Sequence, residues 1–489
     1  MTALQLAPDE LSPLALDGPR GRRRPARSHA VRLLQVMVLT LFIFPSNAVI
    51  HAVGGAGYVA ALVTYLMLIL YVGYSLVGLH NPLQYHTPVR TALCALWMAT
   101  MISYLLMDRS LLNQTQLTGA DRWLLQLAGV TAIVLVASEC LRSFEDIRRV
   151  MRAMVWGMAF CGLVAAIQFW GHHDITPYLR KIPGFSLNAA AGIYGIESRG
   201  GVARVAGTGI DPIEMGVVAG MILPIALYLA IYDRHRSLIS RWLPVVFIAV
   251  AIPTSVSRSA ILAVLISVGT FIISMQPRMR MAAFSAIPVA LGVMFVAAHH
   301  LIGTLETYFL AGSADNSIEH RLNNYPYVES LVRLHPWFGQ GGGTYYFTTQ
   351  VNIFDNQYLT TVVELGLVGI VVLAFYLVWP ALAALSARRL ALTDSTKQLC
   401  AVLAGAELAA VLCSGTFDSL SFPLFVNVQA LVIGLTGAAW LLVRADVRAV
   451  KKAQALTAAR PQTSTWHVNG VSVWRSPALN GAVKPDGGN

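Results

Sequence analysis

Three arginines stand in polar segments of a chain that is otherwise mostly hydrophobic. Arg204 lies in RVAGTGIDPIEMG, Arg258 in TSVSRSAI and Arg321 in HRLNNYPYVESL. A guanidinium group stays charged when partly desolvated, and its donors match two oxygens of a phosphate. These three arginines therefore predict a site for an anionic ligand, of which a diphosphate is the simplest example.

Each arginine also has a purely structural interpretation. Arg258 can extend its charged end from a helix terminus to the membrane interface. Arg204 can pair with Asp211 or Glu214, and Arg321 can be a solvated loop residue. The coincidence of all three favours ligand binding over any one of these explanations.

Candidate proton acceptors cluster in the same part of the chain. Asp355 and Asn356 precede a hydrophobic run, where either side chain could cap a helix and Asp355 could act as a general base. Glu364 lies inside that run, so its carboxylate needs a partner and can join helices. His320 and His335 are further candidates for a base or for sugar binding.

A glycine-rich turn lies within the run HPWFGQGGGTYYF, from His335 to Phe347. Gly341 could let backbone N–H groups approach a phosphate, although a flexible loop explains the glycines equally well. Tyr345 and its aromatic neighbours could contact sugar rings or form an interfacial belt. The pair His172–His173 is weak evidence for a metal, and we expect neither a metal nor a cofactor.

Composition determines what kind of element must position these residues. The 489 residues are 56% hydrophobic and 12% charged, whereas about a quarter of a soluble domain is charged. The sequence predicts an all-α polytopic membrane protein with about 12 transmembrane helices. The predicted spans are 31–50, 56–79, 89–107, 123–140, 150–170, 213–232, 241–255, 258–275, 282–302, 357–380, 398–414 and 422–443.

Charged residues orient these spans. Arginine and lysine recur in alternate short loops, which predicts cytoplasmic termini by the positive-inside rule and accounts for the net charge of +11 without nucleic acid. We therefore expect a flexible cytoplasmic arm at 1–30, a transmembrane domain at 31–443 and a disordered cytoplasmic tail at 444–489. Two long extracytoplasmic loops remain, 171–212 and 303–356, the second between spans nine and ten. Within the second loop, the apolar spacing of Tyr325 to Leu334 predicts a short amphipathic helix on the membrane surface. The five cysteines show no disulfide or zinc spacing.

The ordered motifs resemble the O-antigen ligase/polymerase family of membrane glycan polymerases and ligases. The resemblance covers about residues 200–370 and rests on motif order. The matching residues are Arg204, Gly207, Thr208 and Pro212, then Ser257, Arg258 and Ser259, then Arg321, Pro336, Gly339 and Gly341, and finally Asn356, Leu359, Glu364, Gly366 and Gly369. One position departs from the family, which often has a histidine where this chain has Asp355.

This resemblance implies an inverting glycosyltransferase of the bacterial inner membrane that needs no metal. The donor would be a polyprenyl-diphosphate-linked oligosaccharide at the outer leaflet, and an acceptor hydroxyl would attack its anomeric carbon. Arg204, Arg258 and Arg321 would stabilise the diphosphate leaving group, with Asp355 as base. The expected partners are this lipid-linked donor, membrane lipid and other polysaccharide assembly and export proteins.

We expect polymerisation of O-antigen-like or exopolysaccharide repeat units, with three alternatives left open. A ligase would transfer a finished glycan to a lipid or protein acceptor with the same donor chemistry. A transporter of lipid-linked glycans would carry charges at the bilayer midplane and show repeats, which are not evident here. A catalytically inactive scaffold is the third, because Asp355 replaces the usual histidine.

Overall fold

The computed structural model describes residues 26–50, 57–174, 178, 184–187, 196–199, 202–297, 324–345, 353–458, 467–468 and 471–472. Contacts divide the chain into two units, Gly18–Arg444 and Met1–Asp17 together with Ala445–Asn489. The described part of the second unit is the end of one helix and an antiparallel pair of short strands, β5 (His467–Val468) and β6 (Val471–Ser472). The candidate site lies in the first unit.

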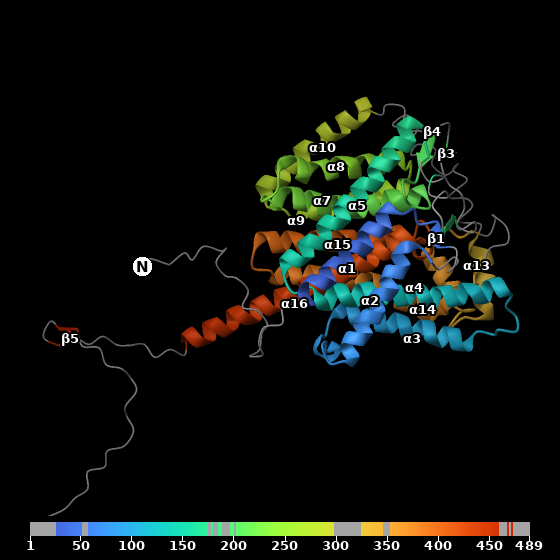
Figure 1. The fold of residues 1–489 in the computed structure, drawn as a ribbon, viewed down its shortest axis with the longest axis horizontal. Coiled ribbons are helices and arrows are strands. Elements are labelled where there is room, and N and C mark those ends of the chain that lie inside the picture. The colour runs from blue at the N-terminus through green and yellow to red at the C-terminus, as the bar shows by residue number, and fades with distance from the viewer. Residues whose placement is uncertain are drawn as a thin grey trace, which may run out of the picture. The chain divides into compact units, whose positions relative to one another are not determined.

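The structure is mostly helical, as predicted (Figure 1). Every predicted span overlaps one long helix. These helices are α1 (Ala26–Ile43), α2 (Val59–Leu76), α3 (Pro88–Leu106), α4 (Gln114–Cys140), α5 (Phe144–Gly171), α7 (Pro212–Tyr232), α8 (Leu238–Thr254), α9 (Arg258–Ser274), α10 (Pro277–Ala297), α14 (Gln357–Leu390), α15 (Asp394–Cys413) and α16 (Pro423–Ala458). Among the described residues, eight helices are long and apolar enough to cross a membrane, and three apolar helices are shorter. A polytopic helical membrane protein is therefore supported, while the number of crossings stays a prediction.

Two details differ from the expected organisation. Helix α16 continues to Ala458, so the first part of the predicted disordered tail at 444–489 is helical. The reason is local composition, because RADVRAVKKAQALTA is rich in strong helix formers. Short strands also occur in the loops. They are β1 (Ala48–Ile50), β2 (Phe185–Leu187), β3 (Ile196–Arg199) and β4 (Val202–Val205), paired β1 with β2 and β3 with β4, all antiparallel.

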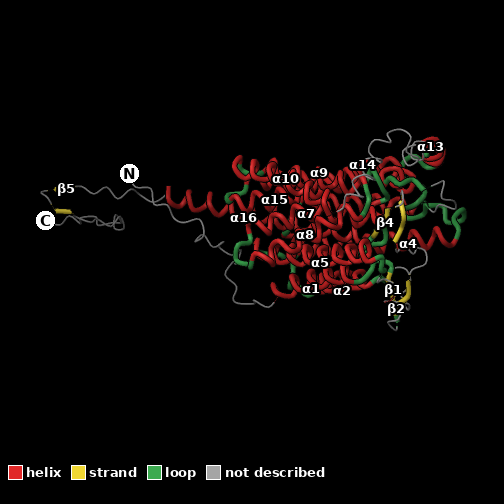
Figure 2. The backbone as a smooth tube through the Cα atoms, turned by 90° about the horizontal axis from the view of Figure 1, so that it is seen from above, coloured by secondary structure: helices red, strands yellow, loops and turns green. Residues whose placement is uncertain are grey.

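Most connections gather at one end of the helices, which we call the loop-rich end. It consists of the described residues of 44–58, 107–113, 172–211, 255–257, 335–356 and 414–422. Figure 2 shows strands β1, β2 and β4 and helix α13 (Tyr325–Leu334) at this end. Hydrogen bonds between distant loops hold it together, such as Ser46 N to Thr208 O at 3.1 Å. This is the end predicted to face outward.

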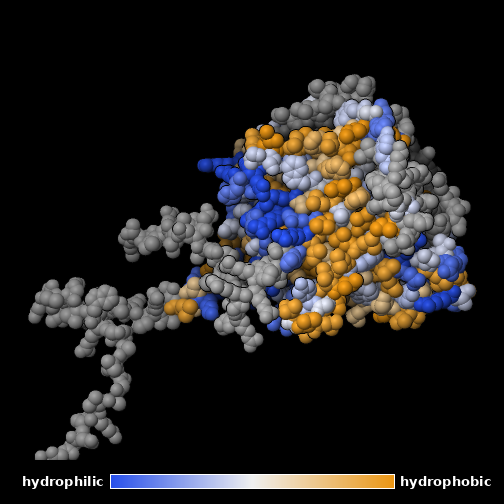
Figure 3. Space-filling view, viewed as in Figure 1, coloured by the Kyte–Doolittle hydropathy of each residue, from blue (hydrophilic) through white to orange (hydrophobic). Residues whose placement is uncertain are grey.

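The opposite end carries the arginine-rich connections, and we call it the basic end. It consists of 77–87, 141–143, 233–237, 275–276 and 391–393 with the adjoining helix turns. Arg152 pairs with Asp233 at 3.0 Å, and Tyr232 donates to Asp394 at 2.8 Å. Figure 3 shows an apolar band beside hydrophilic residues at this end, the pattern expected of helices that cross a membrane.

Helix α7 lies in the centre of the first unit, packed against α5, α8, α9 and α15. Small residues let α7 and α9 approach closely, as in many membrane helix pairs. A Cβ atom added at Gly216 would lie 2.4 Å from Ser255 Oγ, and one at Gly220 would lie 2.7 Å from the Cβ of Ala263. This close packing fixes the turn that carries Arg258 against the core.

Candidate active site at the loop-rich end

Arg204 is buried on strand β4, with 8% of its surface exposed. Its guanidinium donates to Glu197 Oε2 on the paired strand at 3.0 Å and lies 3.6 Å from Asp211 Oδ1. Its Nε donates to the carbonyl of Ser255 at 3.1 Å. The expected ion pair with Asp211 is therefore present, and Arg204 also holds the turn that precedes α9.

Glu214, the other acid expected near Arg204, has a different role. One oxygen of its buried carboxylate accepts from the backbone N–H groups of Leu424 at 2.6 Å and Phe425 at 3.2 Å. The other oxygen accepts from Ile210 N at 2.8 Å. Glu214 therefore satisfies the otherwise unpaired N–H groups of the first turn of α16.

Arg258 is the first residue of α9. Two residues before it, Val256 has a positive φ of 45° and is 4% exposed. A β-branched residue rarely adopts this conformation, which persists only where the surroundings impose it and which concentrates at functional sites. The hydrogen bond from Arg204 to Ser255 is one such restraint. Arg204 thus contacts the strained turn that leads directly into Arg258.

The end of α15 connects this turn with the start of α14. The thiol of Cys413 donates to Ser259 O at 3.4 Å. Gln357 N donates to Ser414 O at 2.9 Å. Ser259, next to Arg258, and Gln357, next to Asn356, thus contact consecutive residues at the end of α15. The Arg258 turn and the segment that contains Asp355 therefore lie around the same helix end.

Asn356 caps α14, because its Oδ1 accepts from Tyr358 N at 2.9 Å. The capping interpretation is therefore correct for Asn356. Asp355 is half-buried and has a positive φ of 47°. Aspartate tolerates this conformation better than most residues, and it places Asp355 outside the helix at its entrance.

Asp418 is a second carboxylate at this entrance that the sequence interpretation missed. Its Oδ1 accepts from the hydroxyl of Thr360 at 2.5 Å, in the first turn of α14. Asp418 also lies near enough to Tyr345 to influence its pKa. Burial is the main cause that raises the pKa of Tyr345 above its usual range, and electrostatic interactions with Tyr327 and then Asp418 raise it further. Asp418 is the only charged residue of the predicted outer loop 415–421, and this isolation is the signal that could have identified it.

Helix α14 is broken at Gly366, where φ is 70° and ψ is −165°. The glycine-rich segment fills the break with backbone hydrogen bonds. Gln340 N donates to Val363 O at 3.1 Å, and Gly341 N donates to Glu364 O at 3.0 Å. In return Leu367 N donates to Pro336 O at 2.9 Å, and Val368 N donates to Trp337 O at 3.1 Å.

Two intrahelical bonds, from Leu367 to Val363 and from Val368 to Glu364, are thus exchanged for four bonds to the glycine-rich segment. The N–H groups of Gln340 and Gly341 serve α14 in this arrangement, rather than a phosphate. The segment is packed closely, since a Cβ at Gly339 would lie 2.3 Å from the backbone of Glu364. Glycine is required here for backbone approach, so the flexible-loop interpretation does not describe this turn.

The buried carboxylate of Glu364 has a partner, as predicted, but that partner lies in the loop, and the contact with another helix is made by the backbone carbonyl. Its side chain accepts from Tyr345 N at 3.2 Å, and its carbonyl also accepts from the hydroxyl of Ser103 on α3 at 3.1 Å. Tyr345 stacks on the buried ring of Phe354 with centroids 4.3 Å apart. The carboxylate of Glu364 therefore fixes the position of Tyr345 beside the entrance to α14.

The remaining predicted residues fall in two groups. His335 is exposed and ends α13, and this helix spans Tyr325–Leu334 as the apolar spacing predicted. His320 and Arg321 lie outside the described residues. Within the described part of the chain, no group of three or more His, Cys, Asp and Glu side chains could hold a metal ion.

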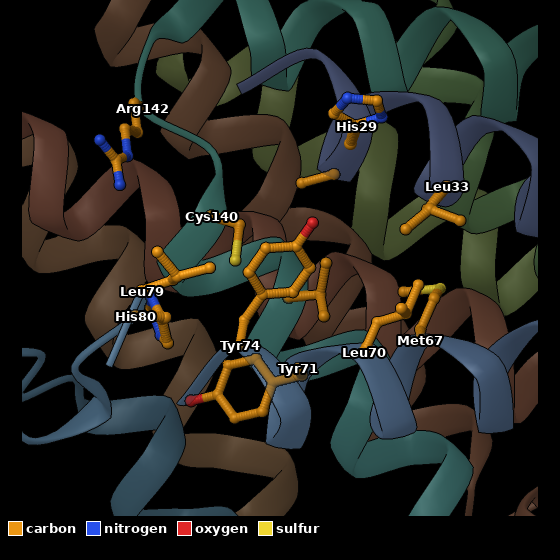
Figure 4. A pocket seen from close by; sticks show the side chains of 12 residues that line it. His29, Leu33, Met67, Leu70, Tyr71, Tyr74, Leu79, His80, Cys140 and Arg142 are labelled. Carbon is orange, nitrogen blue, oxygen red and sulfur yellow. The ribbon is translucent and has the colours of Figure 1, made fainter. Parts of the chain in front are cut away.

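A buried acidic residue at the basic end was not predicted. The carboxylate of Glu139 accepts from the hydroxyl of Tyr71 at 2.7 Å and lies 2.9 Å from His80 Nε2 and 3.5 Å from an Arg90 nitrogen. A cavity of about 110 Å³ lies beside this group. Figure 4 shows Tyr71, Tyr74 and His80 around it, with His29 and Arg142 further out. It belongs to the opposite end from the predicted site.

Comparison with known proteins gives one family match, and it covers most of the candidate site at the loop-rich end. Residues 243–374 match the family model described as O-antigen ligase (Wzy_C). This range begins in α8, includes Arg258, Asp355 and Glu364, and ends in α14. No curated protein matches the chain significantly. The match supports the resemblance to the O-antigen ligase/polymerase family over residues 243–374, which is about a quarter of the chain.

Proposed function

We propose that this membrane protein polymerises glycan repeat units from polyprenyl-diphosphate-linked oligosaccharides at the outer face of the bacterial inner membrane. One observation carries the proposal. The contacts around the end of α15 bring the Arg258 turn to the α14 entrance, where Asp355 and Asp418 lie. Cations for a diphosphate and carboxylates for a proton thus come from segments far apart in sequence.

The reaction joins an acceptor sugar hydroxyl to the donor. The hydroxyl oxygen forms a bond to the anomeric carbon while the bond from that carbon to the diphosphate oxygen breaks, with inversion at the carbon. The hydroxyl proton passes to a carboxylate, and polyprenyl diphosphate leaves with the electron pair. Positioned cations that stabilise the leaving diphosphate lower this barrier without further proton transfer, so the scheme needs no metal.

The arginines have different parts in this scheme. Arg258, at the helix start, contacts the diphosphate. Arg204 is a positioning residue, because its Nε holds Ser255 O and two carboxylates already balance its charge. Arg321 completes the diphosphate site from the large loop, an assignment that depends on motif order alone.

Asp355 is the proposed base, and Asp418 is the alternative carboxylate at the same entrance. Three further residues support the site through hydrogen bonds. Asn356 caps α14, Gly341 donates to the carbonyl of Glu364 in α14, and the side chain of Glu364 accepts from Tyr345 N. Tyr345, His320 and His335 are proposed sugar contacts, since aromatic faces and imidazoles suit carbohydrate rings and hydroxyls.

Ligation is the second candidate, because the matched family model is described as O-antigen ligase. A ligase would use the same donor and the same leaving group. It would transfer one finished glycan to a lipid or protein acceptor instead of extending a chain. The residues above do not depend on which acceptor enters.

The test is product analysis with the purified protein and a polyprenyl-diphosphate-linked oligosaccharide in detergent. A ladder of extended glycans supports polymerisation. Arg258→Ala should lower the rate by about 10²–10³-fold, the usual effect of removing one donor to developing negative charge. Arg278→Ala, an exposed arginine at the start of α10, is the matched control and should keep wild-type activity.

The remaining outcomes separate the candidates. Single transfer to an added lipid A-type acceptor, without a ladder, would support ligation. Release of no polyprenyl diphosphate under any acceptor condition, with folded protein, would contradict both forms of glycan transfer.

A further inference from the structure

A polar cavity of about 250 Å³ opens at the basic end, between α1, α5, α7 and α8. Its lining combines four arginines with a single aspartate. These residues are Arg149, Arg152, Arg236, Arg241 and Asp233. The volume is below the ~300–1,000 Å³ of sites for drug-sized ligands, so a small charged group suits it better than an oligosaccharide.

Two of the four arginines have structural partners. Arg152 lies between Glu145 at 2.5 Å and Asp233 at 3.0 Å. Arg241 donates to the carbonyl of Ala230 near the end of α7. Removing either side chain would disturb helix packing as well as charge.

The other two arginines are available to a ligand. The side chain of Arg236 makes no hydrogen bond or ion pair with any residue that the structure describes, and it is exposed. Arg149 is 53% exposed, and its nearest acids are Glu145 at 3.5 Å and Asp146 at 3.7 Å. Exposed pairs of this kind contribute only about 0–1 kcal/mol, so Arg149 can exchange them for a phosphate.

An apolar surface adjoins the charged cavity. Trp156 lines the cavity and is 42% exposed. On α8, which supplies Ser240 and Arg241, the large apolar side chains of Leu238, Ile239 and Trp242 are exposed. Figure 3 shows hydrophilic residues at this end directly beside the apolar band. Tryptophan beside arginine at such a boundary is typical of the membrane interface.

We propose that this cavity binds the phosphodiester headgroup of an anionic phospholipid. Arg149 and Arg236 contact the phosphate, and the acyl chains lie along the exposed apolar residues of α5 and α8. Basic pockets between helices at the cytoplasmic side of membrane proteins are suited to such headgroups. The site is separate from the proposed glycan site, which lies at the opposite end of the helices.

The experiment measures lipid retention on the purified full-length protein by native mass spectrometry. The probes are phosphatidylglycerol, phosphatidylcholine and water-soluble glycerol 3-phosphate, each added at equal concentration. We expect phosphatidylglycerol to be retained over phosphatidylcholine, and Arg149→Gln and Arg236→Gln each to lower that preference by about fivefold. Arg234→Gln, in the same loop but outside the cavity lining, should leave it unchanged.

Three results would overturn the proposal. Equal retention of the two lipids would remove the headgroup preference. An equal loss in Arg234→Gln would assign the preference to general surface charge instead of the cavity. Competition by glycerol 3-phosphate as strong as that of phosphatidylglycerol would assign the site to a soluble phosphate.

Discussion

The two ends of α9 present the same contact in different surroundings. At the loop-rich end Arg204 donates to Ser255 O at 3.1 Å, just before the helix. At the basic end Arg388 donates to Ser274 O at 3.2 Å, on its last residue. Arg388 acts between regular helices, whereas Arg204 is buried with two carboxylates beside a strained turn. One arginine secures helix packing, and the other secures an irregular backbone.

Irregular backbone follows the same division. All three non-glycine residues with positive φ in the described part of the chain lie at the loop-rich end: His172, Val256 and Asp355. The break in α14 is filled by loop residues of this end as well. Strain of this kind costs about 1–3 kcal/mol at each position and persists at functional sites. The concentration of irregular backbone at the loop-rich end therefore supports the site proposed there.

The largest expected effect comes from Gly366→Ala. The conformation at Gly366 is available essentially to glycine alone, and an added Cβ would lie 2.3 Å from the backbone of Trp337. We expect loss of folded protein, measured by size-exclusion chromatography and melting in detergent. Gly269→Ala in α9, where a Cβ meets nothing within 4 Å, is the control and should behave as wild type. A folded, active Gly366→Ala protein would show that the break is dispensable.

A smaller effect is expected from removing the proposed base. Asp355→Asn should lower kcat/KM by about 10²–10⁴-fold and abolish the acidic limb of the pH profile, because the amide that replaces the proposed base has no carboxyl proton to lose as pH rises. In Asp418→Asn the amide oxygen can still accept from Thr360, so kcat/KM should fall by less than about tenfold. The reverse pattern in the two pH profiles would make Asp418 the base. Melting temperatures near wild type in both variants would exclude misfolding as the cause.

The smallest effect sharpens the comparison between the ends of α9. Arg204→Gln and Arg388→Gln should each lower stability, since a hydrogen bond from a charged group contributes about 1.5–3 kcal/mol. Only Arg204→Gln should also reduce glycan transfer, by about tenfold, because its turn positions Arg258. Melting curves and transfer rates of the two variants measure both quantities. Equal rates in both would remove the distinction between the ends.

Hydropathy alone was sufficient to predict the helices. Every predicted span overlaps a long helix, and the short amphipathic helix at Tyr325–Leu334 appears with the predicted bounds. These elements depend on the local pattern of apolar residues, which is visible in a short window of sequence. The basic loops were likewise predictable from charge, because arginine and lysine recur in alternate loops along the chain.

The site was only partly predictable, because its contacts join distant segments. Arg204, Arg258 and Asp355 were identified from residue type, but the link through Cys413 and Ser414 required the fold. Asp418 was missed because its loop shows no motif. The break at Gly366 was missed because its partners are backbone groups of another segment, which no side-chain pattern reveals.

The exchange of hydrogen bonds between α14 and the glycine-rich segment has a consequence for membrane insertion. A broken span carries four backbone groups, at Val363, Glu364, Leu367 and Val368, that would cost several kcal/mol each if left unpaired in lipid. Their partners at 336–341 precede α14 in the chain, so they emerge from the ribosome first. Because the partner segment is synthesised before the broken helix, we expect these four backbone groups to be able to pair as soon as the interrupted span is inserted.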